Sequence, residues 1–247
     1  MPTDTPRLHK NSQTLTLSFE GTLIQSCMSL ADPDDLVLDY TRAMMGALLF
    51  NPEPRRVLMI GLGGGAMVKY LYRHVPQAAL TVVEISQAVI DLRHDFLIPP
   101  DDERLQTICA DGAVFLVKPP QRYDLILVDG FHGEGIAEAL CSRSFYNHCR
   151  KALTPEGLLV ANVHAEVTQA REIGKRLSKI FDGAVLSLPS EEGGNDVAIV
   201  GPRHVFDEAR ADLDHLWARL QPIHQSTLSD VLPRLKHALE RSTFSAG

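Results

Sequence analysis

The chain has 247 residues, of which 45% are hydrophobic and 22% are charged, and its net charge is −7. These values are ordinary for one globular domain with a small appendage, and the acidic balance argues against nucleic acid as a partner. No apolar run reaches the roughly 20 residues of a membrane span, and the polar first ten residues contain no signal-peptide core. Because the four cysteines include no Cys-x-x-Cys pair, we expect buried thiols, no metal and a cytoplasmic protein.

The first segment predicts a tail followed by a short β-hairpin. Residues 1–12 are interpreted as disordered or loosely attached. Apolar and polar residues alternate over 15–19 and again over 23–27, with a break at Glu20-Gly21, which is typical of two paired strands. Since an isolated hairpin is marginally stable in water, we expect it to pack against its own main domain or a partner subunit.

A helix is predicted next. Asp32-Pro33 is a favourable helix start, with proline at the first helical position. Apolar residues then recur at helical spacing from Leu36 to Phe50, and the prolines of Asn51-Pro52-Glu53-Pro54 end the pattern.

From residue 56 onward, strand and helix patterns alternate, which predicts a parallel sheet covered by helices on both faces. The strand patterns lie near 56–60, 80–84, 105–109, 123–129 and 157–163. The helical patterns between them lie near 66–74, 87–97, 111–117 and 142–152.

The end of the alternating region differs from its beginning. After a helical pattern at 166–180, two strand-like runs at 184–188 and 196–200 have no helix between them and should pair antiparallel. A mostly parallel sheet closed by an antiparallel last strand is the Rossmann-like methyltransferase fold, in contrast to the usual NAD-binding fold. The remaining residues, 203–247, predict two helices split near Gln221-Pro222.

We therefore expect an α/β protein of this fold with a short N-terminal β-hairpin. The expected units are the tail and hairpin (1–31), a helix and linker (32–54), the alternating α/β domain (55–202) and C-terminal helices (203–247).

Successive predicted strands end in glycines or acids, and these should gather at one edge of the sheet. Gly61, Gly63 and Gly65 follow the first strand, Glu84 ends the second, Asp111-Gly112 follows the third and Asp129 ends the fourth. Open α/β sheets bind ligands at the carboxyl ends of their strands. The ordered set predicts a nucleoside-binding crevice.

Each residue type has a physical reason to be there. Glycines permit a tight turn and a close approach of backbone to ligand, and the helix after Gly65 points free N–H groups at that ligand. Glu84 follows the loop at the spacing of an acid that binds ribose hydroxyls, and Asp111 could accept from a base amine. The alternative is a plain strand-to-helix turn with acids that act as helix N-caps.

The chain resembles the spermidine synthases (polyamine aminopropyltransferases), over roughly residues 20–202. The resemblance rests on several motifs: Arg56-Val-Leu-Met-Ile-Gly-Leu-Gly-Gly-Gly65, Val83-Glu84-Ile85, Ala110-Asp111-Gly112-Ala113, Tyr123-Asp-Leu-Ile-Leu-Val-Asp129, Leu140-Cys-Ser-Arg-Ser-Phe-Tyr146 and Leu153-Thr-Pro-Glu-Gly157. Ile24-Gln25 and Leu38-Asp-Tyr40 are similar to the family's N-terminal strand and gate helix.

This resemblance implies a role for each matching residue. The implied ligands of the sulfonium nucleoside, decarboxylated S-adenosylmethionine, are Gln25, Gly61, Gly63, Gly65, Glu84, Ile85, Asp111 and Gly112. Asp129 would accept a proton from the attacking polyamine nitrogen or orient it, and Tyr40 would help to position that amine. A protonated amine is no nucleophile, so a carboxylate beside it can both hold the cation and act as base. The family also implies a homodimer.

The chain departs from the family at three positions. Gly64 replaces an acid that binds the aminopropyl amine, Thr41 replaces a histidine on the gate helix, and His132 stands where a second acid follows Asp129. Glu134 is a candidate to replace the missing acid, and His132 is either a near-neutral base or a plain loop histidine. His164, after the fifth strand, is a further candidate at the crevice.

Two other functions stay open. The loss of the acid at Gly64 favours a methyltransferase that uses S-adenosylmethionine on an unidentified acceptor. The third hypothesis is a catalytically silent nucleoside-binding relative, against which Asp129 and Tyr40 count.

Overall fold

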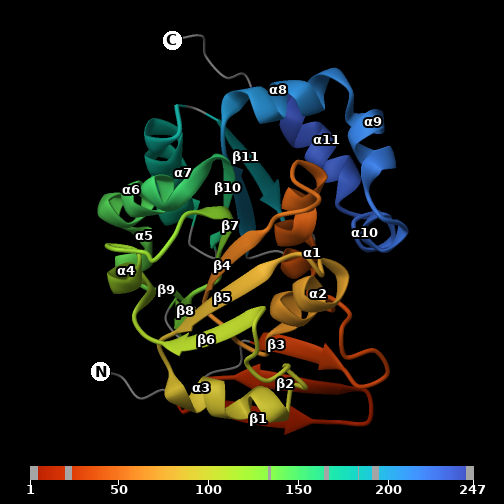
Figure 1. Ribbon diagram of the computed structural model, residues 1–247, viewed down its shortest axis with the longest axis vertical. Coiled ribbons are helices and arrows are strands. Elements are labelled where there is room, and N and C mark those ends of the chain that lie inside the picture. The colour runs from red at the N-terminus through yellow and green to blue at the C-terminus, as the bar shows by residue number, and fades with distance from the viewer. Residues whose placement is uncertain are drawn as a thin grey trace.

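The computed structural model contains one large central sheet with helices on both faces, a small N-terminal sheet at one end and a helical C-terminal region at the other (Figure 1). It describes residues 5–19, 24–132, 135–163, 167–182, 184–190 and 195–242. Within these, the side chains of 131–136 and 167–169 are not described.

The central sheet has seven strands in the order β11-β12-β10-β7-β4-β5-β6. They are β4 (Arg56–Ile60), β5 (Ala79–Glu84), β6 (Leu105–Cys109), β7 (Tyr123–Val128), β10 (Leu153–Val163), β11 (Val185–Pro189) and β12 (Asp196–Val200). The strands from β10 to β6 are parallel, whereas β12 pairs antiparallel with both β10 and β11. The predicted mostly parallel sheet with an antiparallel last strand is confirmed.

The side chains of each central strand point alternately to the two faces of the sheet, and each face has its own hydrophobic core. In β4, Val57 and Met59 belong to one core, whereas Leu58 and Ile60 belong to the other. Successive residues of a strand point to opposite faces, and a sheet buried on both faces needs apolar residues at every position. This explains the unbroken apolar runs in the sequence.

Helices of the central domain follow the predicted positions closely. They are α2 (Ala66–His74), α3 (Gln87–Asp91) with the 3-10 turn η2 (Leu92–His94), α4 (Gly112–Phe115), α5 (Glu138–Cys141), α6 (Arg143–Ala152) and α7 (Val167–Ile180). After β7, the short strands β8 (Phe131–His132) and β9 (Gly135–Ile136) pair antiparallel. The Ser142 hydroxyl fixes the start of α6 by accepting the backbone N–H of Phe145 at 3.1 Å.

The N-terminal sheet has three strands, not two: β1 (Arg7–Lys10), β2 (Thr14–Ser18) and β3 (Ile24–Ser29). The expectation that all of residues 1–12 are disordered or loosely attached is therefore wrong for Arg7–Lys10, which pairs antiparallel with β2. Leu15, Leu17 and Met28 are buried in the core shared with the central sheet. The small sheet thus packs against its own main domain, one of the two predicted alternatives.

The gate helix begins later than predicted. Residues 32–38 form turns, α1 spans Asp39–Met45, and a 3-10 turn, η1, continues over Gly46–Leu49. Asp32 starts a turn, because its carbonyl accepts the N–H of Asp35 at 3.2 Å. The carbonyls of Leu36 and Val37 bind the Arg42 guanidinium at 2.7 and 3.1 Å. These local contacts replace the expected first helical turns.

Four helices follow the sheet instead of the predicted two: α8 (Arg203–Ala211), α9 (Leu213–Arg219), α10 (Pro222–Thr227) and α11 (Leu232–Arg241). The expected break at Gln221-Pro222 is present. One additional break occurs at Asp212, whose carboxylate accepts the N–H of His215 at 3.0 Å and so caps a new helix. Another lies at residues 228–231, which form turns between α10 and α11. In the part of the chain that the structure describes, no helix is long and apolar enough to cross a membrane.

Candidate active site

The loop between β4 and α2 follows the carboxyl end of β4, an interior strand of the sheet. Gly61, Gly63 and Gly65 all have positive φ, at 91°, 52° and 66°, as a tight glycine turn requires. A Cβ on Gly61 would lie 2.2 Å from the carbonyl oxygen of Asp129. Glycine at this position therefore brings the loop directly against the end of β7.

Glu84 closes β5 with only 8% of its surface exposed. One carboxylate oxygen accepts the backbone N–H of Leu62 at 2.8 Å, and the other accepts the N–H of Ser86 at 2.8 Å. The residue therefore braces the glycine loop from the neighbouring strand. Each carboxylate oxygen has two lone pairs, so a ribose role stays a prediction beside this structural one.

Asp111 and Gly112 lie where β6 leads into α4. The Asp111 carboxylate caps this helix by accepting the N–H groups of Ala113 and Val114 at 2.7 and 3.3 Å, both on Oδ1. A Cβ on Gly112 would lie 2.4 Å from the side chain of Ile60, so α4 can cross the end of β4 only with glycine there. The N-cap alternative thus describes Asp111 correctly, and its contact with a base remains a prediction.

The side chain of Asp129 lies at the centre of a hydrogen-bonded group that joins three elements. Its Oδ2 is 3.2 Å from the hydroxyl of Tyr40 in α1, and its Oδ1 accepts from the amide of Asn162 in β10 at 2.9 Å. The Tyr40 hydroxyl is also 3.3 Å from the backbone carbonyl of Gln25 in β3, so one phenolic proton serves two acceptors. The structure brings Tyr40 and Asp129 together, and Gln25 meets them through its backbone.

Asn162 was missed by sequence reasoning. It is buried, and among the described residues nothing hydrogen-bonds its Oδ1. The signal was available, because Asn162 is a polar residue near the carboxyl end of a parallel strand. The candidate predicted near this strand end, His164, lies outside the described residues.

The surroundings of Asp129 set its protonation. Burial raises the pKa of Asp129 to about 6, the hydrogen bonds from Asn162 and Tyr40 pull it down, and the negative charge of Glu84 pushes it up. Burial, followed by the charge of Asp129, raises the pKa of the Tyr40 phenol well above its ordinary value. Tyr40 therefore remains a donor, while Asp129 is poised near neutral pH to take a proton.

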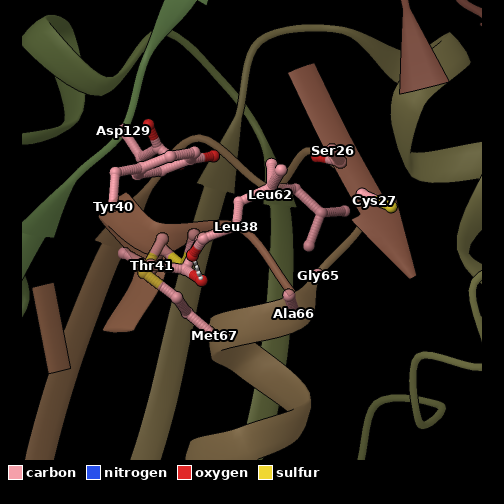
Figure 2. A pocket seen from close by; sticks show the side chains of 11 residues that line it. Ser26, Cys27, Leu38, Tyr40, Thr41, Leu62, Gly65, Ala66, Met67 and Asp129 are labelled. Atoms are coloured by element: carbon pink, nitrogen blue, oxygen red, sulfur yellow. Dashed lines mark hydrogen bonds between the residues drawn. The ribbon is translucent and has the colours of Figure 1, made fainter. Parts of the chain in front are cut away.

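A small pocket lies between the glycine loop, β3 and α1, and Asp129 is one of the residues that line it (Figure 2). Among the described residues that line it, Asp129 is the only carboxylate. The others are Ser26, Cys27, Leu38, Tyr40, Thr41, Met59, Leu62, Gly65, Ala66 and Met67. These lining residues suit a ligand that places one cationic group beside Asp129 and is otherwise largely apolar.

Some predicted site residues lie at the edge of the crevice or beyond the described part of the chain. Ile85 follows β5 and is 51% exposed, so it is available for contact with a ligand. His132 ends β8, but its side chain is not described, and Glu134 lies outside the described residues. Among the residues that are described, no group of three or more His, Cys, Asp or Glu could hold a metal ion.

The chain is similar to known proteins in sequence and in fold. Residues 37–188 match the Spermine/spermidine synthase domain. A polyamine aminopropyltransferase from Chromobacterium violaceum is 39% identical over 194 residues, which cover 78% of this chain and 73% of that protein. A probable spermidine synthase from Corynebacterium glutamicum superposes with a TM-score of 0.69 at 24% identity, covering 79% of this chain and 76% of that one.

A spermidine synthase solved in complex with the transition state analogue AdoDATO has a TM-score of 0.62 at 18% identity, covering 90% of this chain and 87% of that one. The two structural matches share the fold. The domain match and the sequence identity establish that the chain belongs to the spermine/spermidine synthase family.

Proposed function

We propose that this protein is an aminopropyltransferase, which moves an aminopropyl group from decarboxylated S-adenosylmethionine to a polyamine nitrogen. The observation that carries the proposal is the Asp129 carboxylate, held between Tyr40 and Asn162 at 3.2 and 2.9 Å beside the glycine loop. Its family membership supports the same activity.

The reaction follows from the chemistry of Asp129. The acceptor ammonium binds beside the carboxylate and gives it a proton, which frees the nitrogen lone pair. The nitrogen attacks the CH₂ carbon bonded to the sulfonium sulfur in line with the leaving group. A C–N bond forms as the C–S bond breaks, and its electron pair leaves with sulfur as the neutral thioether methylthioadenosine.

Side chains around Asp129 prepare this step. Tyr40 and Asn162 each hold one carboxylate oxygen, so the direction of the remaining lone pairs is fixed. The Oδ1 of Asn162, a buried acceptor with no bond to the described part of the protein, would receive an N–H of the bound amine. We therefore add Asn162 to the proposed acceptor-binding residues, beside His132 and Glu134.

The nucleoside would lie along the ends of β4, β5 and β6. In this proposal Gly61, Gly63 and Gly65 face the sulfonium nucleoside, Glu84 and Ile85 the ribose side, and Asp111 with Gly112 the adenine. Glu84 is already placed between the glycine loop and Ser86. Gln25, in β3, would approach from the N-terminal sheet. We also propose a homodimer in the cytoplasm, which light scattering at micromolar concentration and fractionation would test.

One observation favours a second function, methyl transfer from S-adenosylmethionine. Position 64 carries no acid, and a Cβ there would lie 2.8 Å from the ring of Phe96. The loop therefore offers no carboxylate to the amine of an aminopropyl group. Within this reading, Asp129 would serve as base for a different acceptor.

The products separate these functions. The enzyme is incubated with putrescine, cadaverine or spermidine and either decarboxylated S-adenosylmethionine or S-adenosylmethionine, with Asp129→Asn as the control. Methylthioadenosine formed only from the decarboxylated donor, and lost in the control, supports aminopropyl transfer. S-adenosylhomocysteine from the ordinary donor, without methylthioadenosine, supports a methyltransferase. Tight nucleoside binding with neither product supports the silent relative.

The acceptor side has its own test. If Glu134 replaces the missing family acid, Glu134→Gln should raise the Michaelis constant of the polyamine more than it lowers turnover. A remote charge contributes mainly to binding that is equal in ground and transition states. An unchanged Michaelis constant would remove Glu134 from the acceptor site.

A further inference from the structure

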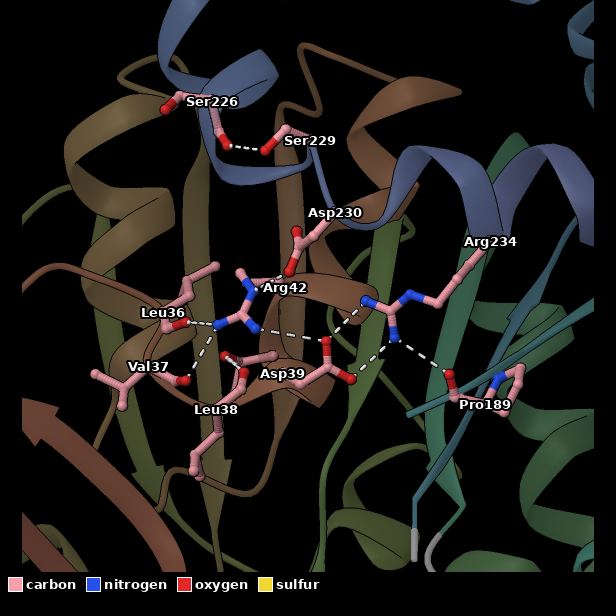
Figure 3. Close-up of polar contacts among 11 residues, drawn as sticks. Leu36, Val37, Leu38, Asp39, Arg42, Pro189, Ser226, Ser229, Asp230 and Arg234 are labelled. Carbon is pink, nitrogen blue, oxygen red and sulfur yellow. Dashed lines mark hydrogen bonds and ion pairs between the residues drawn. The ribbon is translucent and has the colours of Figure 1, made fainter. Parts of the chain in front are cut away.

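A buried carboxylate begins the gate helix α1 and is bound by the far end of the chain. Asp39 is only 1% exposed. Arg234, in α11, donates Nη1 to one of its oxygens at 2.9 Å and Nη2 to the other at 2.7 Å (Figure 3). This two-pronged pairing joins residues that are 195 positions apart, and it fixes direction as well as distance.

A second arginine completes the group. Arg42 is 3.5 Å from Asp39 through Nη2 and donates Nε to Asp230 at 2.9 Å. Its Nη1 binds the carbonyls of Leu36 and Val37, just before the helix. We call Asp39, Arg42, Asp230 and Arg234 the α1 clamp.

The charges of the α1 clamp balance, with two arginines against two aspartates. A carboxylate as buried as Asp39 is costly unless it is paired and hydrogen-bonded. Arg234 also donates to the carbonyl of Pro189 at the end of β11 at 3.2 Å. The clamp therefore ties the first turn of α1 to α11 and to the edge of the sheet.

Tyr40 is the next residue after Asp39. Consecutive residues of a helix point about 100° apart, so fixing Asp39 on one side of α1 sets the direction of Tyr40 on another. The hydroxyl of Tyr40 reaches Asp129 at 3.2 Å. A small rotation or shift of this turn would separate the two groups.

We propose that Arg234 is a positioning residue of the active site, which acts through Asp39 to hold the Tyr40 hydroxyl on Asp129. Its value for catalysis rests on the proposed function, but the structural link does not. Helix α11 lies outside the family-matched residues 37–188. It would nevertheless be needed for a correctly arranged site.

The protonation of Asp129 reports this link directly. The groups that act on this carboxyl are Tyr40 from α1, Asn162 from β10 and the charge of Glu84 from β5. Since the Tyr40 hydrogen bond lowers the pKa of Asp129, loosening Tyr40 should raise that pKa. A change elsewhere in the protein that left Tyr40 in place would not.

The experiment compares Arg234→Lys with Arg241→Lys, the same substitution at an exposed position of α11. Lysine keeps the charge but lacks the two-pronged geometry. The Asp129 carboxyl is titrated by ¹³C NMR in protein labelled at aspartate, with Asp129→Asn to assign the signal. We expect the pKa to rise from about 6 to about 7 in Arg234→Lys and to stay unchanged in Arg241→Lys.

A second comparison uses Tyr40→Phe, which removes the hydrogen bond to Asp129 directly. It should raise the Asp129 pKa by a similar amount, and Arg234→Lys added to Tyr40→Phe should raise it no further, because the affected hydrogen bond is already gone. Additive rises would overturn the proposal. So would an unmoved pKa in Arg234→Lys with an intact fold by circular dichroism.

Two provisions keep the test decisive. If Arg234→Lys does not fold, Asp39→Asn/Arg234→Gln removes both buried charges together and replaces them with a neutral hydrogen-bonding pair; the same rise in the Asp129 pKa is then expected.

The titration of Asp129 does not require an active enzyme. Absence of aminopropyl transfer with a shifted pKa would therefore contradict the proposed function alone, and transfer with an unshifted pKa would contradict the role of Arg234 alone. In an active enzyme, turnover should fall about 5–10-fold in Arg234→Lys with the nucleoside Michaelis constant nearly unchanged.

Discussion

The ring of Phe96 lies over Gly64 so closely that no side chain fits between them. A Cβ on Gly64 would lie 2.8 Å from two ring carbons of Phe96 and 3.0 Å from the Cβ of Ser26. The Ser26 hydroxyl also accepts the N–H of Gly64 at 2.8 Å. The absence of an acid in this loop is therefore built into the packing of its neighbours.

Restoring an acid at this position should destabilise the protein. Gly64→Asp forces the Phe96 ring or the loop to move, and we expect the free energy of unfolding to fall by about 1–3 kcal/mol. Gly64→Asp/Phe96→Ala should be less destabilised than the sum of its single substitutions, because the same ring causes the clash. Urea unfolding of the four proteins measures this, and strict additivity would show that Phe96 is not the obstacle.

Removing the proposed base should affect chemistry far more than binding. Asp129→Asn keeps the shape and the place of the side chain but loses the basic site. We expect turnover to fall by about 10²–10⁴-fold, with the nucleoside dissociation constant by calorimetry nearly unchanged. Turnover at the level of the unaltered enzyme would reduce Asp129 to a structural residue.

The pH profile should show the same carboxyl. Asp129 must be ionised to accept a proton, so kcat/KM should decline as the pH falls below about 6, the pKa to which burial raises this group. Asn162→Ala removes a hydrogen bond that lowers the pKa, so the acidic limb should move to higher pH. Asn147→Ala, in α6, serves as the matched control. A limb that stays in place in Asn162→Ala would assign it to another group.

The nucleoside site can be tested at Glu84. Glu84→Ala should weaken nucleoside binding by about 1.5–3 kcal/mol, the range for hydrogen bonds to a charged group. Part of this loss would come from the loop itself, because the Glu84 carboxylate also holds the N–H of Leu62. Glu84→Gln retains one acceptor oxygen for that N–H but turns an amide NH₂ toward the N–H of Ser86, so it removes the charge and one acceptor together. Unchanged affinity of both variants would place Glu84 outside the binding site.

Stability should depend on pH through a buried histidine. The His224 side chain is fully buried, and its Nδ1 lies 2.7 Å from the hydroxyl of Tyr70. Burial, helped by the nearby His74, lowers the pKa of His224 to about 4. The unfolded chain, with the ordinary value of about 6.5, then binds the proton more tightly than the folded protein does.

Protonation of His224 therefore destabilises the folded protein. As the pH falls from about 6.5 to about 4, stability is lost, by up to about 3 kcal/mol for this group. Below about 4 the contribution of His224 no longer changes. As the pH is lowered from 7 to 4, the urea midpoint should fall less in His224→Gln than in the unaltered protein. An equal fall in both proteins would assign the acid sensitivity to another group.

The central sheet could be predicted from the sequence because its signals are local. A strand buried on both faces needs several consecutive apolar residues, as in Leu125 to Val128, and the glycines with positive φ follow directly from the loop pattern. The acids at the strand ends, such as Glu84 and Asp129, could also be predicted, because each directly ends a local apolar run. The structure brings Asp129 and Tyr40 together, and the roles that the family resemblance implies for them stay predictions.

The errors occurred where hydrogen bonds that leave no hydrophobic pattern in the sequence decide the structure. Arg7–Lys10 forms a strand although its residues are exposed, because backbone pairing with β2 supplies what the side chains do not. Asp32-Pro33 is a plausible helix start, but the carbonyls of Leu36 and Val37 are taken by the guanidinium of Arg42. No local pattern links Asp39 to Arg234, and the part of the α1 clamp that depends on α11 could not have been foreseen.

The place of β12 in the sheet has a consequence for how the protein is made. This strand, Asp196–Val200, lies between β10 and β11 and is antiparallel to both. While the chain is synthesised, β10 therefore keeps one unpaired edge until residue 200 has left the ribosome. Exposed strand edges pair readily with other chains. Completion of the sheet thus waits for its last strand, and ribosome-bound chains that end before Asp196 should be the most prone to aggregate.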